Sequence, residues 1–164
     1  MELAEKAQIP GITTLLGGSS FPADHILYSG WPGMHGMAYS SLALEESDLI
    51  IALGCRFDDR ITGDTRTFAR KSRKIHIDID PSEIGKNIKV DVPIVGDLKN
   101  VLSVLNKEVS EKSNVDWINR ISVLRNEHPL TNADQSEGLE MRYIIQEISE
   151  ETNGNAVIVT GVGQ

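Results

Sequence analysis

Short apolar runs alternate along this chain with segments of helix length, and this alternation limits the folds that the chain can adopt. The run LIIALG at residues 49–54 is continuously apolar, which is typical of a strand covered on both faces of a sheet. Further strands are predicted at residues 11–16, 74–80 and 92–96. Strands separated in this way indicate the α/β class, with an open parallel sheet and flanking helices.

The segments between the strands carry helix signals. Residues 2–8 have the character of the end of a helix, and a loop rich in glycine and proline at 21–36 precedes a predicted helix at 37–46. Another helix is predicted at 63–70. Asp97 is a suitable N-cap for a helix that follows the last strand. The apolar face of that helix would consist of Leu98, Val101, Leu102, Leu105 and Val109.

The chain changes character after residue 109. A helix is predicted at 115–127, between two polar stretches, and a strand at 156–160 that leads into GVGQ. A further amphipathic helix is expected, and its inward face would consist of Leu139, Met141, Ile144, Ile145 and Ile148. The expected organisation is a domain at 1–109, a linker with one helix at 110–138, and the first helix and strand of a second α/β domain at 139–164.

Charge and cysteine content exclude several classes of protein. The chain has 16 basic and 24 acidic residues and a net charge of -8, whereas nucleic-acid binders are normally basic. Its hydrophobic content of 40% is too high for a disordered chain, and no apolar stretch is long enough for a membrane helix. The single Cys55 cannot form an internal disulfide, which favours a reducing, cytoplasmic setting.

Basic residues nevertheless gather in one part of this acidic chain. The cluster consists of Arg56, Arg60, Arg66, Arg70, Lys71, Arg73 and Lys74. Two interpretations stay open, namely a solvated helix face and a pocket for a phosphorylated cofactor.

Ligands of open parallel sheets bind beyond the carboxyl ends of the strands, and two such ends carry suitable side chains. In the segment GCRFDDR, Gly54 permits close approach of the backbone, and Arg56 can hydrogen-bond a phosphate. Asp58 can accept from ribityl or ribose hydroxyls, and Arg60 can hold a substrate carboxylate. The acidic strand end HIDID at 76–80 suits a nucleotide ribose.

Two loops are weaker candidates for ligand contact. The segment TLLGG at 14–18 offers backbone amides and a hydroxyl, although an ordinary strand exit has the same composition. The loop WPGMHG at 31–36 can bring its backbone close to a flat ring, with Met34 as a soft contact. His35 taken alone is more typical of a structural histidine.

Motifs for catalysis or metal binding by the chain's own side chains are missing. The sequence places no base beside Cys55, and the four histidines are too scattered for a ligand set. The G-x-S-x-G, P-loop and complete G-x-G-x-x-G motifs are also missing. We therefore predict no catalytic residue and no metal ligand in this chain.

Six segments together resemble the catalytic large subunit of acetolactate synthase, a family also called acetohydroxyacid synthase. They are ITTLLGGSSFPADH, GWPGMHGMAY, DLIIALGCRFDDRITG, KIHIDIDPSEIGKN, DVPIVGDLKNVL and VIVTGVGQ. The resemblance covers nearly the whole chain and is weakest at 110–138. It implies a Rossmann-like central FAD-binding domain without its first strand, followed by the start of the thiamine-diphosphate domain, so that the chain is truncated at both ends.

The resemblance also implies an activity for the parent enzyme. Two pyruvates, or pyruvate and 2-ketobutyrate, would condense to acetolactate or acetohydroxybutyrate with release of CO2, in branched-chain amino-acid biosynthesis. FAD, thiamine diphosphate and Mg2+ would be the cofactors. The partners would be small-molecule 2-ketoacids, with no nucleic acid or membrane, in a homodimer or tetramer with a possible regulatory small subunit. This chain alone is expected to be inactive.

Family roles carry over to matching positions. The expected cofactor-binding residues are Thr14, Leu15, Met34, His35, Gly54, Cys55, Arg56, Asp58, Arg60, Ile61, Asp78, Ile79, Asp97, Leu98, Gly163 and Gln164. Asp59 and Arg60 are the expected substrate-binding residues. Cys55 stands where the family commonly has Ala or Val, and a backbone contact there would survive the change. Gly161 stands where the family often has Asp, which puts the thiamine contact of this segment in question.

Two alternatives stay open at this point. The chain could be the FAD- or nucleotide-binding module of another thiamine-diphosphate enzyme, of the glyoxylate carboligase or pyruvate oxidase type. It could also be a stand-alone nucleotide-binding protein with no carboligase parent.

Overall fold

The computed structural model describes residues 1–130 and 141–159, which belong to two units of the chain. The first unit is Met1–Pro129 and the second is Leu130–Gln164. The sheet and all the expected cofactor-binding residues between Thr14 and Leu98 lie in the first unit.

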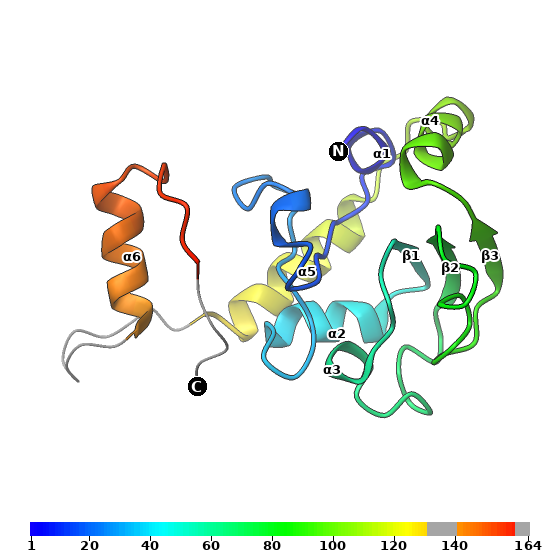
Figure 1. Cartoon of the computed structure of the whole chain (residues 1–164), viewed down its shortest axis with the longest axis horizontal. Coiled ribbons are helices and arrows are strands. Elements are labelled where there is room, and N and C mark those ends of the chain that lie inside the picture. Colours follow the sequence, from blue (N-terminus) through cyan, green and yellow to red (C-terminus); the bar gives the residue numbers. More distant parts are fainter. Residues whose placement is uncertain (131–140, 160–164) are drawn as a thin grey trace. The chain divides into compact units, whose positions relative to one another are not determined.

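Within the described residues, three strands form the sheet: β1 (Leu49–Leu53), β2 (Arg73–Asp78) and β3 (Val92–Val95). They are parallel and lie side by side in the order β1-β2-β3 (Figure 1). Their register places Leu53 beside Ile77, and Asp78 beside Val95, so that the three carboxyl ends lie at one edge. The predicted open parallel sheet is therefore confirmed.

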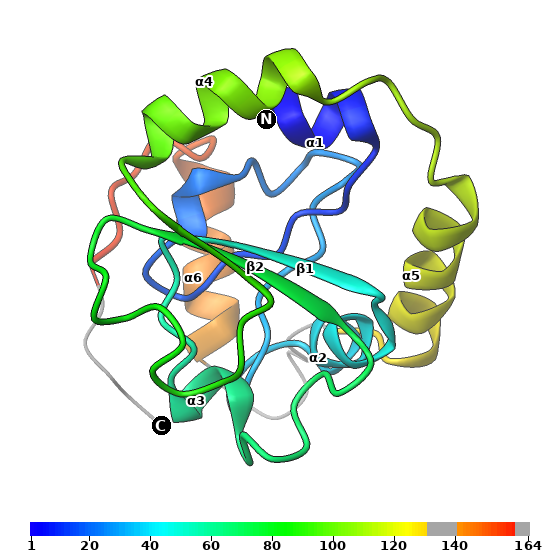
Figure 2. The same cartoon turned by 90° about the vertical axis from the view of Figure 1, so that its right-hand side faces the viewer.

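Helices flank the strands on two sides. Helices α1 (Glu2–Ala7) and α4 (Leu98–Glu108) lie on one side, and α2 (Ala38–Glu46) and α3 (Asp59–Thr62) on the other (Figures 1 and 2). The predicted N-cap of α4 is confirmed, because the side chain of Asp97 accepts a hydrogen bond from the Asn100 amide over 3.1 Å. The predicted helix at 37–46 is confirmed as α2.

Two apolar clusters form the core of the first unit. One joins Ile50 and Ala52 of β1 to Phe57, Phe68, Ala69 and Ile88. The other packs Tyr39 and Ala43 of α2 against Ile121 and Leu124 of α5 (Val115–Glu127). Arg120 of α5 also pairs with Glu46 of α2, with 2.6 Å between nitrogen and oxygen. Helix α5 therefore packs as part of the first unit, although its sequence neighbours are polar.

The predicted strand at 11–16 is wrong beyond its first residues. Within the described residues, the segment forms an isolated bridge from Gly11 to Tyr28. The chain then turns, because the Gly17 amide donates to both the carbonyl and the hydroxyl of Thr14. The side chain of Leu15 is 71% exposed. Apolar β-branched residues favour a strand, but they do not supply a neighbouring strand to pair with.

The predicted helix at 63–70 is also wrong, since the helix of this region lies one turn earlier. The side chain of Asp58 accepts from the Arg60 amide and starts α3, and Gly63 ends it with a φ of 56°. Residues 63–71 then form turns, in which the Asp64 side chain accepts from the Arg66 amide. The hydrogen bonds of Asp58 and Asp64 to nearby amides therefore decide where the helix lies, and the apolar pattern of residues 63–70 does not.

Burial of the strands also differs from the expectation. The predicted cover on both faces of β1 is incomplete, because Leu49 is 44% exposed. On β2, the polar residues Lys74, His76 and Asp78 are buried. The strict alternation of this strand therefore does not separate a buried apolar face from a solvated polar one.

The second unit contains α6 (Met141–Glu151), which matches the predicted helix near 139–148. Its apolar residues Met141, Ile145 and Ile148 are exposed, contrary to the expected inward face, and Leu139 lies outside the described residues. The predicted strand at 156–160 is not formed over 156–159, and Thr160 is not described.

Among residues 1–130 and 141–159, no helix combines enough length with enough apolar character to cross a bilayer.

Candidate functional site

The carboxyl ends of the three strands are tied together by backbone hydrogen bonds. The Gly54 amide, just after β1, donates to the Ile77 carbonyl over 2.8 Å. The Gly96 amide, just after β3, donates to the Asp78 carbonyl over 2.9 Å. The segments that begin at Gly54, Ile79 and Asp97 therefore start side by side, as the parallel sheet predicts.

Gly54 allows a close approach at this edge. Its φ of 59° lies in the left-handed region, and a Cβ at this position would lie 2.9 Å from Cδ1 of Leu98. The first residue of α4 therefore packs directly against the backbone of the loop after β1. Two of the expected cofactor-binding residues, Gly54 and Leu98, are neighbours in the fold.

Cys55 follows Gly54 at the carboxyl end of β1. Burial raises the pKa of the Cys55 thiol to about 11, and the charges of Asp58 and Asp78 add to that rise. The thiol is consequently neutral at physiological pH, which is unsuited to a nucleophile. Arg56, the next residue, is exposed and forms no ion pair with any residue in 1–130 or 141–159.

The short helix α3 carries the expected substrate contacts. One oxygen of Asp58 caps the helix by accepting from the Arg60 amide over 3.1 Å. The Arg60 guanidinium lies 3.2 Å from a carboxylate oxygen of Asp59, and both side chains are exposed. An exposed ion pair of this kind contributes only about 0–1 kcal/mol, so Arg60 can exchange Asp59 for another carboxylate at little cost. Ile61 is half-buried beside it.

The loop at 31–36 is held against α3. The Met34 amide donates to the Arg60 carbonyl over 2.9 Å. Gly33 has a φ of 106°, and a Cβ there would collide with the same carbonyl. The Trp31 indole donates to the His35 carbonyl over 3.2 Å, which closes the loop on itself. The side chains of Met34 and His35 remain exposed.

The segment of Thr14 and Leu15 adjoins the start of this loop. The Thr13 amide donates to the Gly30 carbonyl over 3.0 Å. The Thr14 hydroxyl accepts from the Gly17 amide, so it stabilises the local turn. The exposed Leu15 side chain remains available for a ligand, as does the exposed Ile79 beyond β2.

One feature of this edge was missed by the sequence analysis. His76, two residues before Asp78, is completely buried, and neither ring nitrogen has a hydrogen-bond partner among the described residues. Its Nε2 lies 4.0 Å from Oδ2 of Asp78. The polar positions in the pattern HIDID were the available signal, since burial of a polar strand position calls for a partner.

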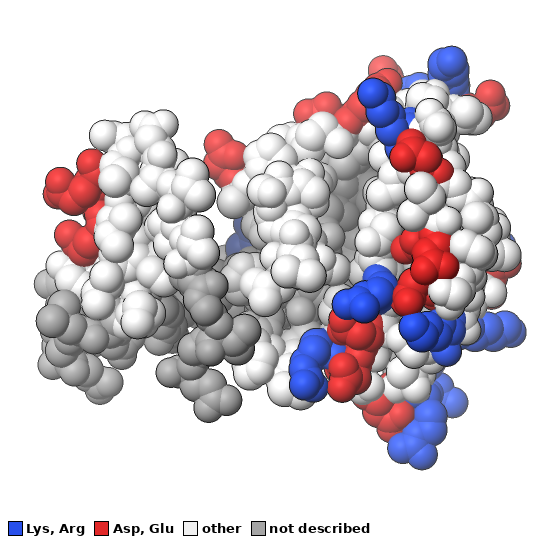
Figure 3. Space-filling model, in the orientation of Figure 1, with Lys and Arg blue, Asp and Glu red and all other residues white. Residues whose placement is uncertain are grey.

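The basic cluster does not form one continuous anionic pocket. Arg66 pairs with Asp64 over 2.8 Å. Lys74 is buried, and its ammonium donates to the carbonyls of Ala69 and Ser72 over 2.7 and 2.9 Å. Figure 3 shows basic and acidic side chains interleaved over the region of α3 and the strands. Of the two interpretations, a single pocket built from all seven residues is therefore not supported.

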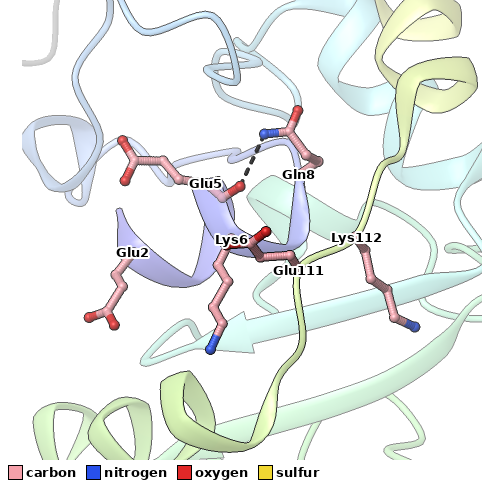
Figure 4. A pocket seen from close by; sticks show the side chains of 6 residues that line it. All are labelled: Glu2, Glu5, Lys6, Gln8, Glu111 and Lys112. Atoms are coloured by element: carbon pink, nitrogen blue, oxygen red, sulfur yellow. Dashed lines mark hydrogen bonds between the residues drawn. The ribbon is translucent and has the colours of Figure 1, made fainter.

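A hollow of about 420 Å³ lies elsewhere in the first unit (Figure 4). It is lined by Glu2, Glu5, Lys6, Gln8, Glu111 and Lys112. These side chains fan outward instead of converging on one point, and none of them is an expected site residue. We therefore place the candidate site at the carboxyl edge of the sheet.

The described residues at the carboxyl edge of the sheet combine several features that occur in ligand sites of α/β domains. Backbone loops approach closely, apolar side chains are exposed, and charged groups suited to phosphate and hydroxyls stand between them. The profile of the thiamine pyrophosphate enzyme family, central domain, matches residues 1–105. The chain belongs to this family.

Curated relatives match nearly the whole chain. It is 45% identical over 170 residues to the acetolactate synthase large subunit IlvB1 of Mycobacterium tuberculosis, covering 99% of this chain and 28% of that protein. It is 43% identical over 175 residues to a probable acetolactate synthase large subunit of Methanocaldococcus jannaschii, covering 100% and 29%. The large subunit of Corynebacterium glutamicum is 42% identical over 168 residues, covering 98% and 27%.

These matches confirm the resemblance to acetolactate synthase large subunits and do not favour the two alternatives. The chain spans somewhat more than a quarter of the length of the relatives that it matches. The expected contacts of Gly163 and Gln164 with thiamine diphosphate lie outside the described residues, as does Gly161.

Proposed function

We propose that this chain is the central flavin-binding segment of an acetolactate synthase, together with the start of the thiamine-diphosphate domain. The parent enzyme joins two pyruvates, or pyruvate and 2-ketobutyrate, and releases CO2. The observation that carries the proposal is the 45% identity to an acetolactate synthase over 99% of the chain. Thiamine diphosphate, with Mg2+, supplies the electron sink for the decarboxylation when it is bound.

The residues at the carboxyl edge suit FAD. The exposed side chains of Leu15, Met34 and Ile79 offer apolar contacts for the flat rings of the cofactor. Arg56 forms no ion pair with a described residue and suits the pyrophosphate. The Asp58 carboxylate has one oxygen that accepts no hydrogen bond from a described residue, and this oxygen suits a ribityl hydroxyl.

Arg60 is the proposed contact for the carboxylate of the incoming 2-ketoacid, with Asp59 beside it. Its guanidinium is exposed and, among residues 1–130 and 141–159, pairs with Asp59 alone, in a surface ion pair. The fork of an arginine can bind a carboxylate through two parallel hydrogen bonds. The Arg60 carbonyl accepts a hydrogen bond from the Met34 amide, in a loop proposed to contact the flavin. This location on α3 would place the substrate contact beside the flavin.

We further propose the assembly and the setting of the parent enzyme. It acts as a homodimer or tetramer, with a regulatory small subunit as a further partner, and it needs neither nucleic acid nor a membrane. The lone thiol of Cys55 suits a reducing cytoplasm.

Flavin binding is tested by titrating the chain into FAD and following the flavin fluorescence. We expect saturable quenching with FAD and none with riboflavin, which lacks the phosphates. An Arg56→Ala variant should weaken binding, whereas Lys99→Ala, a change of an exposed basic residue on α4, should not. Equal quenching by FAD and riboflavin would contradict the proposed pyrophosphate contact.

The synthase activity is tested in a chimera. This chain replaces the matching segment of the Mycobacterium tuberculosis large subunit, and acetolactate is measured from pyruvate with FAD, thiamine diphosphate and Mg2+. We expect turnover by the chimera and none by the chain alone. A chimera that folds and binds FAD but produces no acetolactate would count against an acetolactate synthase parent.

A further inference from the structure

The strongest unexplained feature of the described residues is the buried side chain of His76. It is completely inaccessible to solvent, yet neither Nδ1 nor Nε2 has a hydrogen-bond partner among the described residues. Buried polar groups in proteins are almost always paired, because an unpaired group loses its hydration without compensation. The burial of this imidazole therefore calls for a partner.

The nearest acceptor is the carboxylate of Asp78. Both side chains leave the same face of β2, because residues two apart in a strand point to the same side. Nε2 of His76 lies 4.0 Å from Oδ2 of Asp78, so closure by about 1 Å would form a hydrogen bond. Such a gap is too short for a bridging water, which needs hydrogen-bond length on both sides.

The surroundings hold the imidazole in this place. The ring of Phe57 meets the His76 ring edge to face, with centroids 5.2 Å apart and an angle of 84°. Phe57 itself belongs to the core cluster with Phe68. A ring packed in this way cannot swing out to solvent, so Asp78 is its route to a hydrogen bond.

The carboxylate of Asp78 is held on its other side as well. Its Oδ1 accepts from the Asp80 amide over 2.9 Å, while Oδ2 faces His76. The bond at Oδ1 restrains the carboxylate on one side and leaves lone pairs on Oδ2 for further donors. Asp78 stands at the carboxyl end of β2, where the proposed cofactor lies.

We propose that His76 is a positioning residue: through an N–H at Nε2, it holds the carboxylate of Asp78 in the orientation that accepts from a hydroxyl of the cofactor. This inference rests on the proposed flavin site. His76 does not touch the cofactor, and it acts through Asp78.

The contact itself is tested without any cofactor. Nitrogen-15 spectra of the chain labelled at histidine report which ring nitrogen carries the proton. We expect His76 to carry a proton on Nε2, and Asp78→Asn to shift its signals while those of the exposed His128 stay unchanged. An Nε2 without a proton, or a His76 spectrum insensitive to Asp78→Asn, would overturn the proposal.

The positioning role is tested by FAD affinity in a double-mutant cycle. We expect His76→Phe to weaken binding about tenfold in the wild-type chain and to have little further effect after Asp78→Asn. His76→Gln, which keeps an N–H donor, should restore part of the affinity, and His128→Phe should change nothing. The same weakening by His76→Phe in both backgrounds would assign His76 a packing role only. A wild-type chain that binds no FAD refutes the flavin site. In that case the nitrogen-15 spectra still test the contact between His76 and Asp78.

Discussion

The main-chain amide of Met34 donates a hydrogen bond of 2.9 Å to the carbonyl oxygen of Arg60. This bond joins the loop at 31–36 to α3, and the whole of α2 and β1 lies between the two in the sequence. It brings the residue proposed to contact the flavin next to the residue proposed to contact the substrate. The positions of Met34 and Arg60 are therefore coupled through their main chains.

Gly33→Ala should disrupt this junction. The new Cβ would collide with the Arg60 carbonyl, and the φ of 106° is unfavourable for any residue with a Cβ. We expect a loss of about 1–3 kcal/mol in the free energy of unfolding, measured by urea denaturation. Gly18→Ala is the matched control, because Gly18 has open space around it and no positive φ. Equal stability of the two variants would show that the loop can move away from α3.

Arg60→Ala should impair use of the 2-ketoacid in the chimera. We expect the KM for pyruvate to rise about tenfold or more, because a charge-assisted contact with the carboxylate is lost. The free energy of unfolding should change by less than about 1 kcal/mol, since the ion pair with Asp59 is exposed. Arg66→Ala removes a similar exposed pair with Asp64 and is the control. An unchanged KM would exclude Arg60 as the carboxylate contact.

Cys55 should make stability depend on pH in the alkaline range. Burial raises its pKa from 9.0 to about 11 in the folded chain. The folded state thus favours the neutral thiol, so the contribution of Cys55 is present below pH 9 and is lost as the pH rises through 11.

The test compares the chain with its Cys55→Ala variant, because other groups titrate in the same range. The difference in the free energy of unfolding between the two chains should be constant below pH 9. Between pH 9 and 11, the wild-type chain should lose stability relative to the variant. Asp58→Asn should lower the pKa of the thiol and speed its reaction with a disulfide reagent. A thiol that reacts at the same rate in both chains would contradict the charge effect of Asp58.

Lys74→Met should destabilise the first unit. The buried ammonium donates to the carbonyls of Ala69 and Ser72, and its removal leaves both acceptors without this donor. We expect a loss of about 2–3 kcal/mol in the free energy of unfolding, measured by urea denaturation. Lys99→Met, an exposed position on α4, should stay within about 0.5 kcal/mol of the wild type. A similar effect of both changes would mean that Lys74 contributes no more than a surface lysine.

The sheet was predictable because its signals are local. Short apolar runs identified β1 and β3, and the alternation of polar and apolar residues at 74–80 identified β2. A single aspartate identified the start of α4. The segment at 11–16 has the same kind of composition and forms only a bridge, since a strand also depends on a neighbour. The helix expected at 63–70 was displaced to α3 by the competing caps of Asp58 and Asp64.

The sequence by itself determined the class of the fold and identified, from the order of strands and loops, the segments that end at one edge of the sheet. Only the tertiary structure decided that Met34 lies against Arg60 and that His76 is buried beside Asp78. It also decided that the Lys74 ammonium donates to backbone carbonyls. The physical reason is that periodicity and capping act within a few residues. Hydrogen bonds and burial between distant residues exist only once the packed chain has excluded water from around them.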